Sequence, residues 1–149
     1  MTADDLAELD LAYAPPFSSA KDPVNMAGFA IQNILEGLVK QVSWAEAEAR
    51  SEGVVLLDTR TQGEFEKGHL EGALHIPLNS LRERIDEIPS DPPLYVYCQS
   101  GLRSYIACRI LSQHGFECFN VSGGYGFYAS VKSDAEFREE GRGGCGLKG

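Results

Sequence analysis

One strand that leads directly into a loop and a helix constrains the fold of this 149-residue chain more than any other feature. Residues 94–97 are apolar or aromatic and follow the prolines of 89–93, so they predict a short, fully buried strand. Residues 98–103 form a brief loop with one glycine, and the apolar residues of 104–111 recur at helical spacing. Buried strands that alternate with helices are typical of parallel sheets.

The rest of the middle of the chain repeats this alternation of strand-like and helix-like segments. The predicted strands are 39–42, 53–57, 73–76, 94–98 and 117–121. We therefore predict an α/β fold in which a central parallel five-stranded sheet carries helices on both faces and follows an N-terminal helical segment. The carboxyl ends of parallel strands meet at one edge, where ligands bind.

Two helices between the predicted strands have clear local signals. Ser43 and Glu46 form a capping-box pattern that opens a helix through residue 50. A second helix is predicted over 78–88, with Leu81, Ile85 and Ile88 on one face, and the proline-rich run 89–93 ends it.

Cys98 is the candidate nucleophile. A thiol between a strand end and a helix start faces unpaired backbone N–H groups and the positive end of the helix, and both favour the thiolate. Arg103 adds a positive charge that cannot be titrated away. Free cysteines often only fill the core, and Cys108 and Cys118 fit that interpretation well.

Three blocks of this sequence resemble the single-domain rhodaneses, which are persulfide-forming sulfurtransferases. Residues 98–104 resemble the active-site loop of that family. Residues 55–60 and 64–77 resemble its early strand and its Gly-His-x-x-Gly-Ala-x-x-Ile-Pro signature, and 121–125 its late Gly-Gly turn. The blocks occur in the family's order and imply a rhodanese-like fold.

The resemblance implies a function and a set of site residues. Cys98 would be the catalytic residue that forms a persulfide from a sulfane-sulfur donor and passes the sulfur to a thiol acceptor. The substrate-binding residues would be Gln99, Ser100, Gly101, Leu102 and Arg103, and the supporting residues Asp58, Arg60 and Ser104. The lesser alternatives are a non-catalytic interaction module and a cysteine phosphatase, whose loop has one more residue between cysteine and arginine.

Some of these residues keep two interpretations. Asp58 either binds loop groups or an arginine, or only caps its strand; Arg60 either attracts anionic donors or is a solvated turn residue. Gln99 and Ser100 are neutral where family members that use thiosulfate often have a basic residue. This favours a persulfide or polysulfide donor over thiosulfate.

The segment 1–38 lies outside a minimal rhodanese, which we place at 39–138. Residues 5–25 resemble the end of the dimerisation domain of coenzyme A-disulfide reductases and related NADH persulfide reductases, some of which carry a C-terminal rhodanese domain. We interpret the chain as the C-terminal piece of such a fusion, with the reductase domain as partner. FAD, NADH and coenzyme A would belong to that reductase part, and this chain itself would hold no cofactor. The segment 1–38 would be loosely held or form a homodimer.

Composition and charge narrow the remaining function classes. A net charge of −9 argues against nucleic acid and anionic membranes as partners. The sequence shows no transmembrane run, secretory signal or metal-ligand spacing, so we predict a cytoplasmic protein without a metal site. The tail 139–149 is rich in glycine and is predicted to be flexible, with Cys145 either an incidental or a mobile sulfur-carrying thiol.

Overall fold

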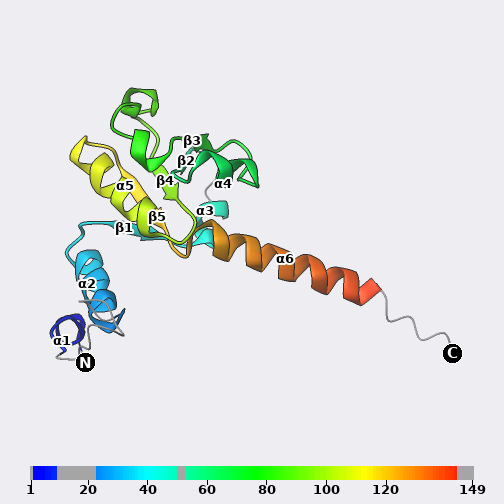
Figure 1. Cartoon of the computed structure of the whole chain (residues 1–149), viewed down its shortest axis with the longest axis horizontal. Coiled ribbons are helices and arrows are strands. Elements are labelled where there is room, and N and C mark those ends of the chain that lie inside the picture. Colours follow the sequence, from blue (N-terminus) through cyan, green and yellow to red (C-terminus); the bar gives the residue numbers. More distant parts are fainter. Residues whose placement is uncertain (1, 10–22, 50–52, 144–149) are drawn as a thin grey trace. The chain divides into compact units, whose positions relative to one another are not determined.

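The computed structural model describes residues 2–9, 23–49 and 53–143 of the chain (Figure 1). The chain divides into two compact units, Met1–Lys40 and Gln41–Gly149. The second unit contains most of the sheet and every predicted site residue.

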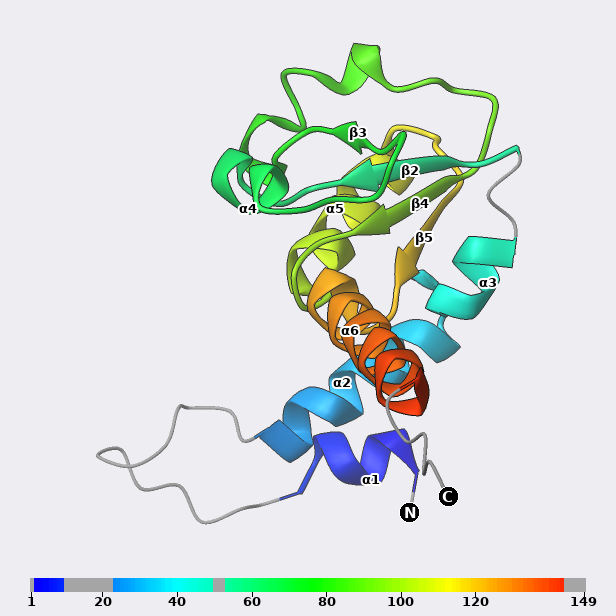
Figure 2. The same cartoon turned by 90° about the vertical axis from the view of Figure 1, so that its right-hand side faces the viewer.

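The sheet has five strands, as the alternation in the sequence predicts. They are β1 Lys40–Val42, β2 Val55–Asp58, β3 Leu74–His75, β4 Leu94–Tyr97 and β5 Cys118–Val121, in the spatial order β1-β5-β4-β2-β3. The pairs β2–β3, β2–β4 and β4–β5 are parallel. Figure 2 shows β3, β2, β4 and β5 side by side. The predicted α/β fold with a central five-stranded sheet is therefore confirmed, with strand bounds within two residues of those predicted.

Strand β4 lies at the centre of the sheet, and its residues are buried on both faces. Side chains alternate between the two faces of a strand. Tyr95 and Tyr97 join a core cluster with Trp44 of helix α3 (Trp44–Ala49) and partly buried residues of helix α6 (Gly124–Gly143). Helix α5 (Leu102–Gln113) packs against β4 and β5. The four-residue apolar run thus marks the strand that both layers of helices cover.

Helix α3 begins with the predicted capping box. The Ser43 backbone N–H donates to Glu46 Oε2 over 2.9 Å, and the Glu46 N–H donates to Ser43 Oγ over 3.3 Å. The cap places Trp44 in the core, where its Nε1–H donates to the Gly124 carbonyl over 2.9 Å. Trp44 therefore ties the start of α3 to the start of α6.

The predicted helix over 78–88 is wrong. The segment instead contains two 3-10 turns, η1 Leu78–Ser80 and η2 Ile85–Glu87. Leu81 and Ile88 are buried, so two separate turns satisfy the apolar spacing that suggested one helix. Hydrogen bonds from each residue to the third preceding carbonyl, such as Ile88 N–H to Ile85, close the turns.

The chain's C-terminal part also differs from the sequence-based expectation. Helix α6 continues through Gly143, so residues 139–143 are helical although their glycine content predicted a flexible tail. A helix that has already started adds one hydrogen bond per residue, which lets it extend through weak helix formers. Cys145 lies outside the described residues.

The described residues of the N-terminal unit form two helices, α1 Ala3–Ala7 and α2 Pro23–Leu35. They approach closely at Gly28, where an added Cβ would lie 2.5 Å from the backbone nitrogen of Ala7. The Asn25 side-chain amide donates to the Leu6 and Ala7 carbonyls at the end of α1. The helical segment predicted before the sheet is therefore present.

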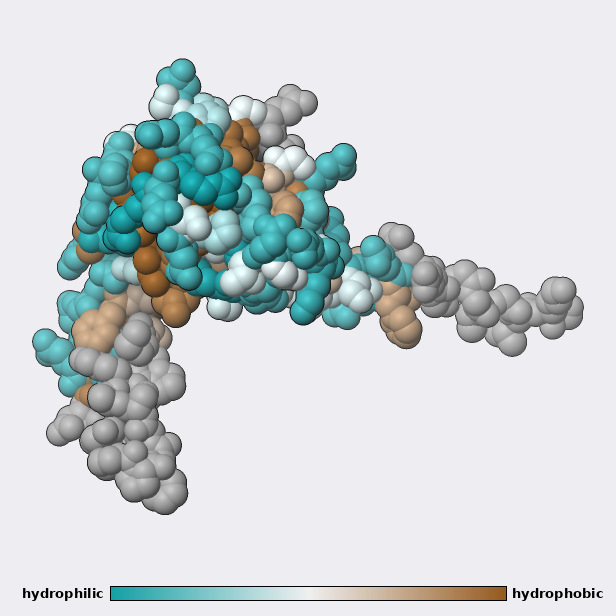
Figure 3. All heavy atoms as spheres, turned by 45° about the horizontal axis from the view of Figure 1, so that its top comes forward, coloured by the Kyte–Doolittle hydropathy of each residue, from teal (hydrophilic) through white to brown (hydrophobic). Residues whose placement is uncertain are grey.

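Figure 3 shows one face of the molecule, where hydrophilic residues predominate and hydrophobic ones form separate patches. Among the described residues, no helix is both long enough and apolar enough to cross a membrane.

Candidate active site

The candidate site lies at the carboxyl edge of the sheet, where β2 and β4 end beside each other. Asp58 is in register with Tyr97, the residue before Cys98. The Thr59 backbone N–H donates to the Tyr97 carbonyl over 3.0 Å and continues the parallel ladder past the strand end. The structure therefore brings Asp58 and Cys98 to one edge, as the strand pattern predicts.

Cys98 lies at the bottom of a loop that turns its donors toward the sulfur. Gly101, with a φ of 108°, reverses the chain and caps helix α5. Its backbone N–H donates to Cys98 Sγ over 3.1 Å, and the Ser104 hydroxyl lies 3.4 Å from the same sulfur. Cys98 itself has no exposed surface. A negative sulfur at this position would have hydrogen-bond donors on several sides.

These donors decide the ionisation of the thiol. Burial raises the pKa of Cys98, but hydrogen bonds from the Ser104 hydroxyl and from the backbone of Ser104, Ser100 and Gly101 lower it. The hydrogen bonds prevail, and the pKa of Cys98 lies below its ordinary value. A larger fraction of this thiol is therefore ionised at neutral pH than of an ordinary cysteine.

We expect Ser104→Ala to raise the pKa of Cys98, because it removes a donor that stabilises the thiolate. The rate of Cys98 alkylation by iodoacetamide should fall roughly threefold at neutral pH, and its pH profile should move to higher pH. Ser112→Ala is the matched control, since Ser112 is exposed on the same helix and its hydroxyl donates to the Arg109 carbonyl. An unshifted profile in Ser104→Ala would contradict this role of the hydroxyl.

The start of helix α6 holds the outer side of the loop. The Tyr125 N–H donates to the Cys98 carbonyl over 2.7 Å, and the Gly126 N–H donates to the Gln99 carbonyl over 3.0 Å. A Cβ on Gly124 would lie 2.6 Å from the Gln99 backbone, so the approach requires glycine there. Because these carbonyls point toward α6, the loop amides are left facing the sulfur.

Arg103 forms a two-pronged ion pair with Glu64 of helix α4 (Gln62–Glu66). Both guanidinium–carboxylate distances are 2.7 Å. Glu64 also accepts bonds from the Thr61 backbone and hydroxyl. The pair with Glu64, and to a lesser extent Cys98, raises the pKa of Arg103. Sequence reasoning missed Glu64: the Thr61-x-x-Glu64 spacing marks a helix start, but not a contact with a residue 39 positions later.

Asp58 and Arg60 form a buried pair next to the loop. Arg60 is 2% exposed and donates through Nε and Nη2 to the Asp58 carboxylate, with a shortest distance of 2.7 Å. It also donates to the Gly68 carbonyl and lies 4.0 Å from the Tyr125 ring centre. The expectation that Arg60 is a solvated turn residue is therefore wrong, and its charge is compensated by Asp58.

The other predicted loop residues lie at the surface. Gln99 and Ser100 are exposed, and the Leu102 side chain is 67% exposed at the start of α5. Of the Gln99 side chain, Oε1 lies 3.5 Å from Arg60 Nη1. The structure thus places Gly101 and Ser104 beside the Cys98 sulfur. The side chains of residues 99, 100 and 102 lie away from it.

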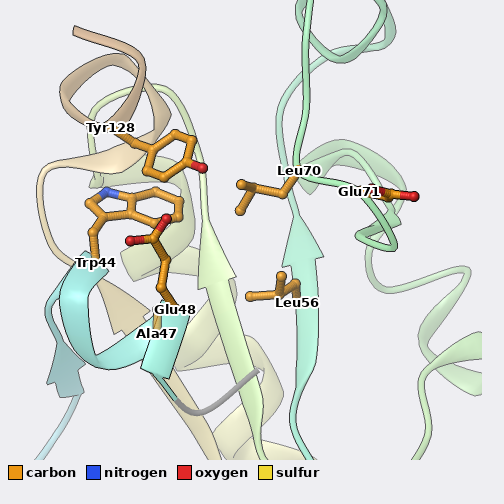
Figure 4. Close-up of a pocket in the computed structure, with 7 residues that line it drawn as sticks. All are labelled: Trp44, Ala47, Glu48, Leu56, Leu70, Glu71 and Tyr128. Atoms are coloured by element: carbon orange, nitrogen blue, oxygen red, sulfur yellow. The ribbon is translucent and has the colours of Figure 1, made fainter. Parts of the chain in front are cut away.

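Two cavities lie along the segment 64–71 and the first turns of α6. The cavity beside the loop, of about 370 Å³, is lined by Arg60, Glu64, Lys67, Gln99 and Tyr125, among others. The other, of about 390 Å³, is mostly apolar, with Trp44 and Tyr128 facing Leu56 and Leu70 (Figure 4). In the described part of the chain, no cluster of three or more histidine, cysteine or acidic residues could hold a metal ion.

A five-stranded parallel sheet that delivers a cysteine into an amide-lined loop defines the class of rhodanese-like proteins. The rhodanese-like domain family matches residues 41–130, and the chain belongs to this family. A sulfurtransferase of Allochromatium vinosum is 40% identical over 83 residues, which are 55% of this chain and 78% of that protein. The uncharacterized protein YqhL of Bacillus subtilis is 39% identical over 89 residues, 59% of this chain and 71% of that protein.

Two solved structures match more of the chain than the rhodanese-like domain alone. Reduced CoADR-RHD of Bacillus anthracis is 44% identical with a TM-score of 0.85, over 90% of this chain and 24% of that one. A NAD-dependent persulfide reductase from A. fulgidus is 43% identical with a TM-score of 0.74, over 86% and 23%. The chain therefore spans about a quarter of each, which agrees with the resemblance to reductase fusions.

Proposed function

We propose that this chain is a sulfurtransferase that forms a persulfide on Cys98 and passes the outer sulfur to a thiol. Membership of the rhodanese-like family supports the general reaction. The observation that carries the proposal is the position of Cys98 Sγ, which accepts the Gly101 N–H over 3.1 Å and lies 3.4 Å from the Ser104 hydroxyl. These donors stabilise the thiolate that must attack.

In the first half-reaction, the Cys98 thiolate attacks the outer sulfur of a sulfane-sulfur donor. A new S–S bond forms as the donor's own bond to that sulfur breaks, and the electron pair leaves with the donor remnant, such as a thiolate or sulfite. The product is Cys98–S–S⁻, with its charge on the terminal sulfur. Amides of residues 99–103 would surround this sulfur as an oxyanion hole surrounds developing charge.

In the second half-reaction, an acceptor thiolate attacks the terminal sulfur of Cys98–S–S⁻. The acceptor becomes a persulfide and Cys98 leaves as the thiolate, so no outside oxidant or reductant is needed. We propose a reductase domain of the same polypeptide as the partner, with coenzyme A or a reductase cysteine as acceptor. The likeness to CoADR-RHD and the persulfide reductase supports this coupling; FAD and NADH would bind the reductase part.

Mass spectrometry after treatment with a sulfane-sulfur donor tests the proposal. The peptide that contains Cys98 should gain the mass of one sulfur atom and lose it again when a thiol acceptor is added. The hydrogen bond with Cys118, together with burial, raises the pKa of Cys108, so this thiol stays protonated and should remain unmodified, which makes it an internal control. Failure of Cys98 to gain sulfur would favour a non-catalytic interaction module, and turnover of a phosphate monoester instead would favour a phosphatase.

A further inference from the structure

The charges around the cavity beside the loop nearly cancel. Arg60 and Lys67 line this cavity, and Arg103 pairs with Glu64 on its wall. The carboxylate of Asp58 compensates Arg60, and that of Glu64 compensates Arg103. Three cations and two carboxylates leave a single positive charge, which the Cys98 thiolate itself balances. In the reactive form of the site the charges of these side chains and of the thiolate therefore sum to zero, and only the loop amides favour an anion.

Glu64 is the carboxylate whose negative charge lies directly on the wall of the cavity beside the loop. Its side chain is 30% exposed and lines the cavity, whereas Asp58 has no exposed surface and lies behind Arg60. The hydrogen bonds from Arg103 and Thr61 hold the pKa of Glu64 far below its usual range. Glu64 is thus charged at every pH at which the thiolate forms. Its carboxylate accepts hydrogen bonds from both Nη1 and Nη2 of Arg103.

We infer that Glu64 is a specificity-determining residue that disfavours dianionic sulfur donors, so that the site selects donors with at most one negative charge at the transferred sulfur. This inference rests on the proposed sulfurtransferase function. A carboxylate on the cavity wall repels thiosulfate, which carries two charges on a small group, more than it repels a persulfide or thiosulfonate. Glu64 also occupies the Arg103 guanidinium, which could otherwise donate two hydrogen bonds to the oxygens of thiosulfate.

A pair of donors that differ by one charge isolates this effect. Thiosulfate is a dianion and methanethiosulfonate is a monoanion of similar shape, and each transfers its outer sulfur. The Cys98 thiolate would release sulfite from the first and methanesulfinate from the second, while forming the same Cys98 persulfide. The difference in leaving group cancels when the ratio of the two rates is compared between variants.

Glu64→Gln should raise the rate constant for thiosulfate, relative to methanethiosulfonate, by about tenfold. One unit charge acting across roughly 10 Å near a protein surface has an effect of this size. Glutamine can still accept the Thr61 N–H and keep the capping box, so helix α4 should be retained. The measurement is the second-order rate constant of persulfide formation at Cys98, by mass spectrometry at equal ionic strength.

Glu66→Gln is the matched control. It removes the same charge from the same helix, but Glu66 is exposed and bonds to Gln62 instead of Arg103. Its donor ratio should equal that of the wild type. An unchanged ratio in Glu64→Gln, or an equal loss of rate with both donors, would overturn the role of Glu64 in selecting the donor. If the wild type forms no persulfide with either donor, the sulfurtransferase proposal itself fails, and this inference with it.

Discussion

Cys98→Ser should lower the rate of sulfur transfer by about 1,000-fold or more while leaving the fold intact. A serine hydroxyl in the same loop remains protonated at neutral pH, so the nucleophile that attacks the donor is lost. Oxygen also cannot form the persulfide that carries sulfur between the two half-reactions. Because the substitution changes one atom, and Gly101 and Ser104 can still bond to it, we expect the unfolding transition to move little.

Sulfur release and circular dichroism, measured on the same samples, test this expectation. Cys118→Ser is the control for loss of a buried thiol, because a serine there can keep the hydrogen bond to the Cys108 carbonyl. That variant should retain sulfur transfer. Full activity in Cys98→Ser would refute the assignment of the nucleophile. Loss of activity in both variants would instead indicate that the substitutions damage the fold.

The second large effect concerns stability. Asp58→Asn should lower the free energy of unfolding by about 3 kcal/mol or more, because it leaves the buried Arg60 charge without its counter-charge. Arg60 also bonds to Gly68 and contacts Tyr125, so the turn after α4 and the start of α6 should loosen together. Urea denaturation, with the midpoint and slope fitted together, gives the measurement.

The exposed ion pair between Arg84 and Glu87 provides the matched control. Its two side chains are 38% and 49% exposed, and pairs of this kind contribute little to stability. Glu87→Gln should therefore leave the urea midpoint where it is. The double substitution of Asp58 by Leu and Arg60 by Met should recover much of the stability lost in Asp58→Asn, since it removes both buried charges. Equal urea midpoints for Asp58→Asn and the wild type would show that the ion pair between Arg60 and Asp58 does not stabilise the fold.

Much of the fold follows from local patterns. The buried strand 94–97, the capping box of Ser43 and Glu46, and the alternation of strands and helices suffice for a five-stranded parallel sheet. The position of Cys98 at a strand end also follows from its neighbours alone. The helix expected over 78–88 failed because apolar spacing fits two anchored turns as well as one helix, and periodicity does not distinguish them.

The sequence by itself determined where the thiol lies: a buried strand, a glycine turn and a helix start are consecutive, and each is set by adjacent residues. Only the tertiary structure decided which groups surround that thiol. The pairing of β2 with β4 brings Glu64 to Arg103 across 39 residues, and the pairing of β4 with β5 brings the α6 amides to the loop carbonyls. Ion pairs and hydrogen bonds depend on distance in space, and a charge in the sequence carries no sign of its burial or its partner.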